Sequence, residues 1–274
     1  MPEYNNLLKH AIIAAIHAGE EILGVYNVAF EVELKSDRSP LTLADRNAHK
    51  KIMELLAGTK LPVLSEEGRT IPFEERKGWE RFWMVDPLDG TKEFIKKNGE
   101  FTVNIALIEN NKAVMGVIYV PVTDTLFFGA NWLPSSMQQN ALATLKLQQN
   151  TESWYSNLMA TSLKLPLQQI ERPHTIVASR SHLSPETEEF ITGQQKKYGK
   201  LAFISKGSSI KMCLVAEGIA DVYPRIAPTM EWDTAAGQAI VENAGCTMVN
   251  FHTGEPVTYN KENLLNPYFV ITRP

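Results

Sequence analysis

Hydrophobic residues near the start of the chain recur every three or four positions, which is the spacing of one face of a helix. This pattern predicts an amphipathic helix over residues 4–26. A short alternating strand is predicted over residues 30–34. A second helix is predicted from Thr42, as its N-cap, to about Leu56, with Asp45 in its first turn.

Apolar runs then predict a sheet in the first half of the chain. They cover residues 61–64, 82–85, 101–108, 113–120 and 126–129. Residues 101–108 and 113–120 are joined by a short polar segment that contains two asparagines, which is typical of a hairpin. We therefore expect an antiparallel N-terminal sheet with helices packed against it.

The second half of the chain alternates between strand and helix patterns. Strands are predicted over residues 175–178, 201–204 and 220–223, and helices over 184–197, 208–217 and 233–244, followed by edge strands. This alternation predicts a smaller α/β half, so the fold class is α/β of the α+β kind. We place a metal-binding domain at residues 1–135 and a substrate-binding domain at 136–274. Residues 136–172 form a poorly defined junction, with a possible helix at 138–148.

Composition narrows the classes of partner. The chain of 274 residues is 44% hydrophobic and has a formal net charge of −4, so it has no general attraction to nucleic acid or to an anionic membrane. No apolar run is long enough to span a membrane, and peripheral association stays open. Cys213 and Cys246 lie in apolar surroundings and predict buried thiols in a reducing, cytoplasmic environment. No obligate protein partner is indicated.

Two carboxylates end the apolar run that begins at Phe82. Asp86 and Asp89 flank Pro87, and Gly90 follows them. Proline cannot continue a sheet ladder and glycine permits a tight turn, so both carboxylates are expected at a strand end. A lone pair of this kind is most often a solvated turn. Two anions held so close repel each other unless a cation lies between them.

Three further carboxylates stand at the ends of predicted elements: Glu66 after a strand, and Asp45 and Asp233 at helix starts. As an alternative, Asp45 and Asp233 only cap their helices. If these carboxylates converge with Asp86 and Asp89, hard oxygen ligands of this kind favour Mg²⁺, and no His or Cys pattern indicates zinc. Paired Mg²⁺ ions suit the attack of water on a phosphate ester, which points to a phosphatase.

A second feature is the start of the helix predicted at residue 208. Gly207, Ser208 and Ser209 would leave free backbone amides there, and Lys211 follows, an arrangement suited to an anion. The alternatives are that Ser208 is only a cap and that Lys211 is a solvated helix lysine.

Three segments resemble, in order and spacing, the signature motifs of the inositol-monophosphatase superfamily. They are Leu-Ser-Glu-Glu at residues 64–67, Asp-Pro-Leu-Asp-Gly-Thr at 86–91 and Trp-Asp-Thr-Ala-Ala-Gly at 232–237. Residues 91–95, 98–107, 179–182 and 207–218 are similar to the 3′(2′),5′-bisphosphate nucleotidase branch of this superfamily. The resemblance implies the sugar-phosphatase fold, a layered α-β-α-β-α sandwich.

The resemblance also implies roles for the carboxylates. Two or three Mg²⁺ ions would be held by the side chains of Glu66, Asp86, Asp89 and Asp233 and by the main-chain carbonyl of Leu88. The catalytic residues implied are Thr91, Asp45 and Glu66. Thr91, hydrogen-bonded to Asp45, would help to orient and deprotonate the attacking water.

The substrate implied is a small nucleotide, 3′-phosphoadenosine 5′-phosphate, which would be hydrolysed to AMP and phosphate. The amides of Gly90 and Thr91 would hold the phosphate that is cleaved. The full set of substrate-binding residues implied is Glu66, Leu88, Asp89, Gly90, Thr91, Ser208, Lys211, Asp233, Arg180, His182 and Arg225.

Two alternative functions remain. An inositol or sugar monophosphatase is expected to continue Thr-Thr-Asn-Phe after the Asp-Gly pair, whereas this chain reads Thr-Lys-Glu-Phe. The other alternative is a non-catalytic nucleotide-binding regulator that kept the fold. The presence of all the expected ligands and of Thr91 argues against it.

Overall fold

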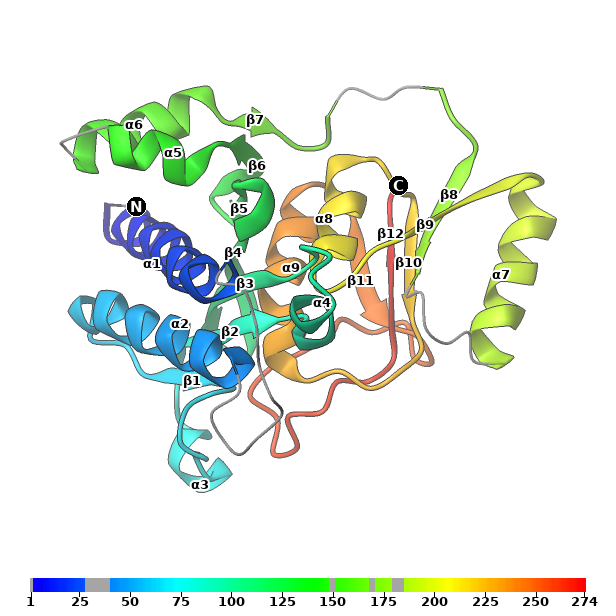
Figure 1. The fold of residues 1–274 in the computed structure, drawn as a ribbon. Helices are drawn as coiled ribbons and strands as arrows, with labels where there is room; N and C mark the ends of the chain where they lie inside the picture. The colour runs from blue at the N-terminus through cyan, green and yellow to red at the C-terminus, as the bar shows by residue number, and fades with distance from the viewer. Residues whose placement is uncertain (1, 28–39, 148–150, 168–170, 179–184) are drawn as a thin grey trace.

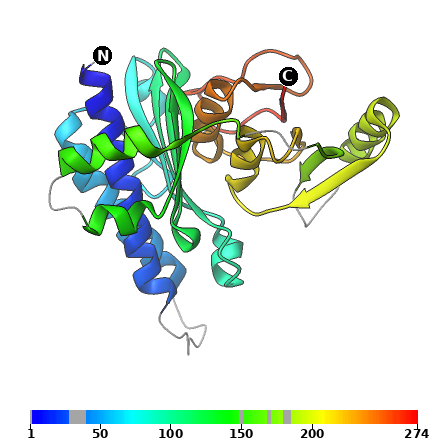
Figure 2. The same ribbon diagram turned by 90° about the horizontal axis from the view of Figure 1, so that it is seen from above.

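The computed structural model describes residues 2–27, 40–147, 151–167, 171–178 and 185–274. The chain forms alternating layers of helices and sheets, which are seen edge-on in Figure 2. An outer helix layer covers a seven-stranded sheet, two central helices lie behind that sheet, and a five-stranded sheet with one further helix completes the stack (Figures 1 and 2). This confirms the predicted α-β-α-β-α sandwich. The strand predicted over 30–34 lies outside the described residues.

The seven-stranded sheet runs in chain order from β1 to β7. Its strands are β1 (Val63–Ser65), β2 (Arg81–Asp89), β3 (Thr102–Glu109), β4 (Lys112–Val120), β5 (Thr125–Ala130), β6 (Leu133–Gln139) and β7 (Leu163–Lys164). Neighbours pair antiparallel except β1 and β2, which are parallel. The predicted hairpin is confirmed, with Asn110 and Asn111 at φ 49° and 63° in its turn. Asparagine tolerates this left-handed conformation better than most residues.

Both faces of this sheet are buried, and alternate residues of each strand serve different cores. Along β3, Val103, Ile105 and Leu107 belong to the core under the outer helices, whereas Ala106 and Ile108 belong to the core on the other face. This double burial explains why the strands read as nearly continuous apolar runs.

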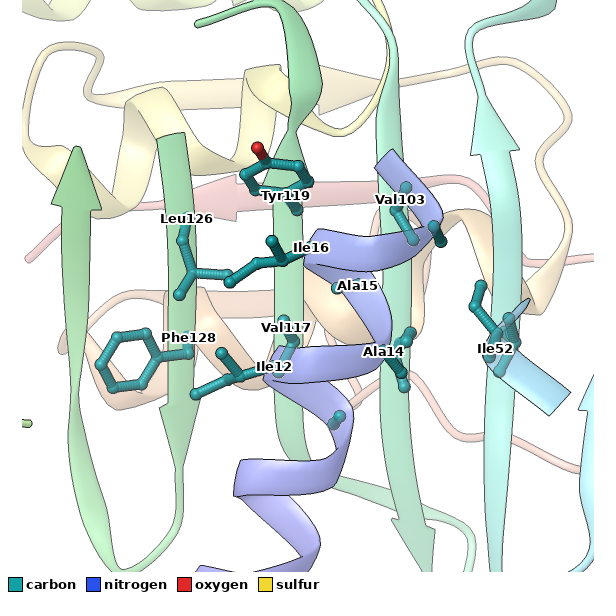
Figure 3. Packing of buried hydrophobic residues seen from close by; sticks show 14 of the residues in the cluster. Ile12, Ala14, Ala15, Ile16, Ile52, Val103, Val117, Tyr119, Leu126 and Phe128 are labelled. Atoms are coloured by element: carbon teal, nitrogen blue, oxygen red, sulfur yellow. The ribbon is translucent and has the colours of Figure 1, made fainter. Parts of the chain in front are cut away.

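The outer helices α1 (Pro2–Tyr26) and α2 (Pro40–Leu56) pack against each other and against β2, β3 and β4. Figure 3 shows Ile12 and Ile16 of α1 lying over Val117 and Leu126. The prediction that α2 starts at a Thr42 N-cap is wrong, because the helix begins at Pro40. Proline suits a first helical position, since its missing N–H would be unpaired there.

The segment after residue 130 belongs to the first sheet. Strand β6 crosses the boundary predicted at residue 135, and the chain returns to it as β7. Between these strands, α5 (Ala141–Leu147) and α6 (Thr151–Thr161) extend the outer helix layer, with Trp154 and Leu158 buried in the same core as α1. The seven-stranded sheet and its outer helices therefore extend to residue 164. The division of the chain into two domains stays a prediction.

The central helices join the two sheets. Helix α9 (Glu231–Asn243) lies against β2 to β6, and α8 (Ile210–Glu217) packs between α9 and the second sheet. That sheet has the order β11-β12-β10-β8-β9. Its strands are β8 (His174–Ala178), β9 (Leu201–Ser205), β10 (Val222–Arg225), β11 (Thr247–Asn250) and β12 (Phe269–Thr272), and α7 (Pro185–Tyr198) covers it. The last strand is internal to the sheet, not an edge strand as predicted.

Short elements complete the fold: η1 (Ala57–Thr59), α3 (Phe73–Arg76), α4 (Thr91–Ile95) and η2 (Pro121–Thr123). Cys213 and Cys246 are both free and buried, which confirms that they are core thiols. None of the described helices combines the length and hydrophobicity needed to cross a bilayer.

Gly116 of β4 allows α9 to approach the sheet. A Cβ at this position would overlap the carbonyl oxygen of Ala236. We therefore expect Gly116→Ala to lower the free energy of unfolding by about 1–3 kcal/mol, because two backbone segments would have to separate. Urea unfolding measures this. The matched control is Gly24→Ala in α1, where a Cβ meets nothing within 4 Å and no loss is expected. Equal stability of the two variants would contradict the prediction.

Candidate metal and phosphate site

The end of β2 sets the position of the first two carboxylates. Asp86 pairs with Asn104 and Asp89 with Thr102, so the ladder shifts register across Pro87 and Leu88. Asp86 is only 1% exposed, and its Oδ1 accepts a hydrogen bond of 3.0 Å from the Leu88 amide. The proline that interrupts the ladder therefore places both carboxylates at one end of a buried strand.

Carboxylates from β2, α2, α9 and the turn after β1 surround Asp86. Burial, and then repulsion from Asp89, Glu66, Asp233 and Asp45, raises the pKa of Asp86 well above its usual value. Burial followed by the charge of Asp89 raises the pKa of Asp233 to about 7. Burial is also the main cause that raises the pKa of Glu66. Carboxylates far apart in the sequence thus interact electrostatically in one acidic cluster.

Asp45 lies at the edge of this cluster, beside Glu67 and Glu66. Burial is the main cause that raises its pKa to about 8. Its Oδ1 is buried without a hydrogen-bond partner. Among the described residues no hydrogen bond joins Asp45 to Thr91, which is exposed at the start of α4. The pairing of these two residues stays a prediction.

The donor chemistry of the cluster fits a hard divalent cation. In the part of the chain that the structure describes, no three His, Cys, Asp or Glu side chains already stand close enough to enclose an ion. Two observations nevertheless favour a bound cation. The buried Oδ1 of Asp45 has no hydrogen-bond partner, and burial together with repulsion from the neighbouring carboxylates raises the pKa of Asp86. A cation would relieve both, and all the donors are oxygens, as Mg²⁺ prefers.

A pocket of about 340 Å³ opens beside these carboxylates. Its lining includes six of the predicted site residues: Asp89, Gly90, Ser208, Lys211, Arg225 and Asp233. A larger hollow of about 560 Å³ lies around Val257 and Leu265, and none of the predicted site residues lines it. The smaller pocket is therefore the candidate substrate site, and its lining combines the carboxylates of Asp89 and Asp233 with the cationic side chains of Lys211 and Arg225.

Lys211 is not the solvated lysine of the alternative interpretation. It is 6% exposed, and its Nζ donates hydrogen bonds to the carbonyl oxygens of Ser208 at 2.7 Å and Lys206 at 3.3 Å. Burial is the main cause that lowers its pKa to about 8. A buried ammonium whose hydrogen bonds within the described residues go to neutral carbonyl oxygens is suited to an anionic ligand.

Ser208 and Asp233 differ in part from their predicted roles. The N-cap of α8 is Ser209, and the Oγ of Ser208 is buried without a partner, so Ser208 is not the cap. Asp233 is the third residue of α9, and its Oδ2 accepts a hydrogen bond of 2.8 Å from the Met230 amide. One carboxylate oxygen of Asp233 therefore caps the helix, as the alternative interpretation predicted. The residue also lines the pocket.

The remaining predicted residues lie as follows. Gly90 has φ 100°, a conformation that glycine adopts without strain. Arg225 lines the pocket, where its Nη2 donates to the Pro228 carbonyl at 3.1 Å while its Nε is buried without a partner. Arg180 and His182 lie outside the described residues.

The sequence interpretation missed the hydrogen-bond network that Ser209 and Asn104 form with Asp89. Both the amide and the hydroxyl of Ser209 donate to Asp89 Oδ2 at 2.7 Å, and Asn104 donates to the Ser209 hydroxyl at 2.8 Å. The Ser209 Oγ also lies 3.0 Å from the Asp233 carbonyl oxygen. A polar Asn within the apolar run of β3 was the signal that could have revealed this network.

Comparison with known proteins identifies the family of this chain. Residues 3–268 match the inositol monophosphatase family. The chain therefore belongs to the inositol monophosphatase family. Over 263 residues it is 41% identical to the 3′(2′),5′-bisphosphate nucleotidase CysQ of Shigella flexneri, with 94% of this chain and 96% of that protein covered. The protein of the same name from Salmonella typhimurium is 40% identical over 271 residues, with 97% and 99% covered.

A solved structure of a related protein has the same fold. The crystal structure of CysQ from Bacteroides thetaiotaomicron, described as a bacterial member of the inositol monophosphatase family, has a TM-score of 0.90 and 50% identity to this chain. The similarity covers 96% of both chains. The fold predicted from the sequence motifs is thereby confirmed.

A divalent cation should stabilise the folded chain, since it relieves the repulsion around Asp86. We expect Mg²⁺ at about a hundred times its dissociation constant to add about 2.7 kcal/mol to the free energy of unfolding. Thermal and urea unfolding after EDTA treatment measure this. Asp89→Asn should lose much of the gain, whereas the control Glu54→Gln, in an exposed pair with Lys51, should keep it. An equal gain in both variants would remove Asp89 from the cation site.

Proposed function

We propose that this chain is a Mg²⁺-dependent 3′(2′),5′-bisphosphate nucleotidase that converts 3′-phosphoadenosine 5′-phosphate to AMP and phosphate. The observation that carries this proposal is the pocket that joins an acidic cluster to Lys211 and Arg225. A bisphosphate needs both sides of such a pocket, one to cleave a phosphate and one to hold the other. The near full-length similarity to CysQ proteins supports the same activity.

The acidic side would bind the metal. Glu66, Asp86, Asp89 and Asp233, with the main-chain carbonyl of Leu88, would hold two or three Mg²⁺ ions, and enzymes of this family are generally dependent on Mg²⁺. When bound, Mg²⁺ lowers the pKa of water and neutralises charge on the phosphate. The fixed carboxylates would keep this charge arrangement in place before substrate enters.

Thr91 and Asp45 would handle the proton of the attacking water. The Thr91 hydroxyl would orient that water, and Asp45 would accept a proton through it. The buried Oδ1 of Asp45, which has no hydrogen-bond partner, is available to accept a proton. The amides of Gly90 and Thr91 would hold the phosphate that is cleaved.

The cationic side would hold the phosphate that stays on the product. Lys211 and Arg225 supply positive charge in the pocket, and Ser208 supplies a hydroxyl that has no partner within the described residues. Charge-assisted hydrogen bonds to phosphate are among the stronger polar interactions in proteins. We infer that Arg180 and His182 complete the contacts with the nucleotide.

A substrate panel tests the proposed function. With Mg²⁺ present, we expect phosphate release from 3′-phosphoadenosine 5′-phosphate to exceed release from inositol monophosphate, because only the bisphosphate engages Lys211 and Arg225. Without Mg²⁺ both rates should fall to background. Equal or reversed rates would favour an inositol or sugar monophosphatase. Nucleotide binding without any turnover would favour a non-catalytic regulator.

The lowered pKa of Lys211 predicts a pH dependence. The Lys211 side chain is positively charged below about pH 8, and it loses this charge as the pH rises through that value. The kcat/KM for the bisphosphate reports groups of the free enzyme. It should therefore decline above about pH 8. Lys211→Met should lower kcat/KM for the bisphosphate about tenfold and abolish its decline at high pH. Adenosine 3′-monophosphate, which lacks the second phosphate, is the control; the same decline with it would exclude Lys211 as the cause.

A further inference from the structure

Glu100 is a buried carboxylate that the proposed metal site does not use. It precedes β3 and is 8% exposed. Its Oε2 accepts a hydrogen bond of 2.8 Å from the Gly207 amide, and its Oε1 lies 3.2 Å from the Nζ of Lys206. Glu100 therefore links the first sheet to the segment 206–209, which leads into α8.

This segment is held from two sides. A Cβ on Gly207 would lie only 2.8 Å from the Glu100 carbonyl oxygen, so the backbones approach closely. On the other side of Ser208, the Ser209 amide donates to Asp89 at 2.7 Å. Between these two attachments Ser208 has φ 43°, which is uncommon for a residue other than glycine. The two carboxylates thus bracket Ser208 and over-determine its conformation.

The same segment positions Lys211. Its Nζ donates to the carbonyl oxygens of Lys206 and Ser208, which are the residues on either side of Gly207. A shift of the Gly207 amide would therefore move both acceptors of the ammonium. Glu100 is not among the residues that line the pocket, but the Gly207 amide to which it is bonded belongs to a segment that does.

We propose that Glu100 is a positioning residue that holds Ser208 and Lys211 for the second phosphate and so favours bisphosphate over monophosphate nucleotides. The inference rests on the proposed nucleotidase function. It assigns the effect to the hydrogen bond between Glu100 and the Gly207 amide, not to the ion pair with Lys206.

Three variants separate these contributions. Glu100→Asp keeps the charge but is one methylene shorter, so it should lose the bond to Gly207. Glu100→Gln keeps an acceptor at the same reach, and Lys206→Met removes only the ion pair. We expect Glu100→Asp to raise KM for 3′-phosphoadenosine 5′-phosphate about tenfold with little change in kcat. KM for adenosine 3′-monophosphate should change less than about twofold in every variant, and the other two variants should stay within about twofold on both substrates.

The outcomes are distinct. If wild type does not hydrolyse the bisphosphate, the proposed function fails. If wild type does so and Glu100→Asp affects both substrates equally, only the positioning role fails. A tenfold loss of selectivity in Glu100→Gln, matched by Lys206→Met, would assign the effect to the ion pair and overturn the proposal. If Glu100→Asp does not fold, Glu100→Met, which also removes the acceptor for the Gly207 amide, replaces it. Unchanged selectivity in Glu100→Met would overturn the proposal.

Discussion

Repulsion among buried carboxylates is the constraint on which this structure depends. Asp86 is almost fully buried among Glu66, Asp89, Asp233 and Asp45, and the pKa of its carboxyl is raised accordingly. Such a cluster costs free energy unless a cation or protons neutralise it. Apolar packing offsets this cost: α2 is fixed in the core on one face of the first sheet, α9 in the core on the other face, and β2 contributes to both.

The site lies where the layers meet, so each side of the pocket comes from a different part of the fold. Asp89 belongs to the first sheet, whereas Ser209 and Lys211 belong to the start of α8. Direct hydrogen bonds from Ser209 to Asp89 join the two sides. The acidic and cationic halves are therefore held in a fixed relation by short polar contacts, and a ligand with two anionic groups can meet both.

Much of this could be predicted from the sequence, because the carboxylates stand in short ordered motifs and the strands in long apolar runs. The layered fold followed from the same motifs. The start of α2 could not be predicted, since Thr42 and Pro40 are both good initiating residues. The roles of Ser209 and Glu100 were also hidden, because each depends on a partner more than a hundred positions away, Asp89 and Gly207 respectively.

Helix α9 has a consequence for how the chain is made. This helix supplies Asp233 and covers β2 to β6, but it lies late in the sequence, at Glu231–Asn243. During synthesis the first sheet would emerge from the ribosome long before the helix that covers its inner face. Residues 1–164 on their own would therefore expose a wide apolar surface, which is a hazard for aggregation. The two halves share one folding event, and a truncated chain should depend on chaperones to stay in solution.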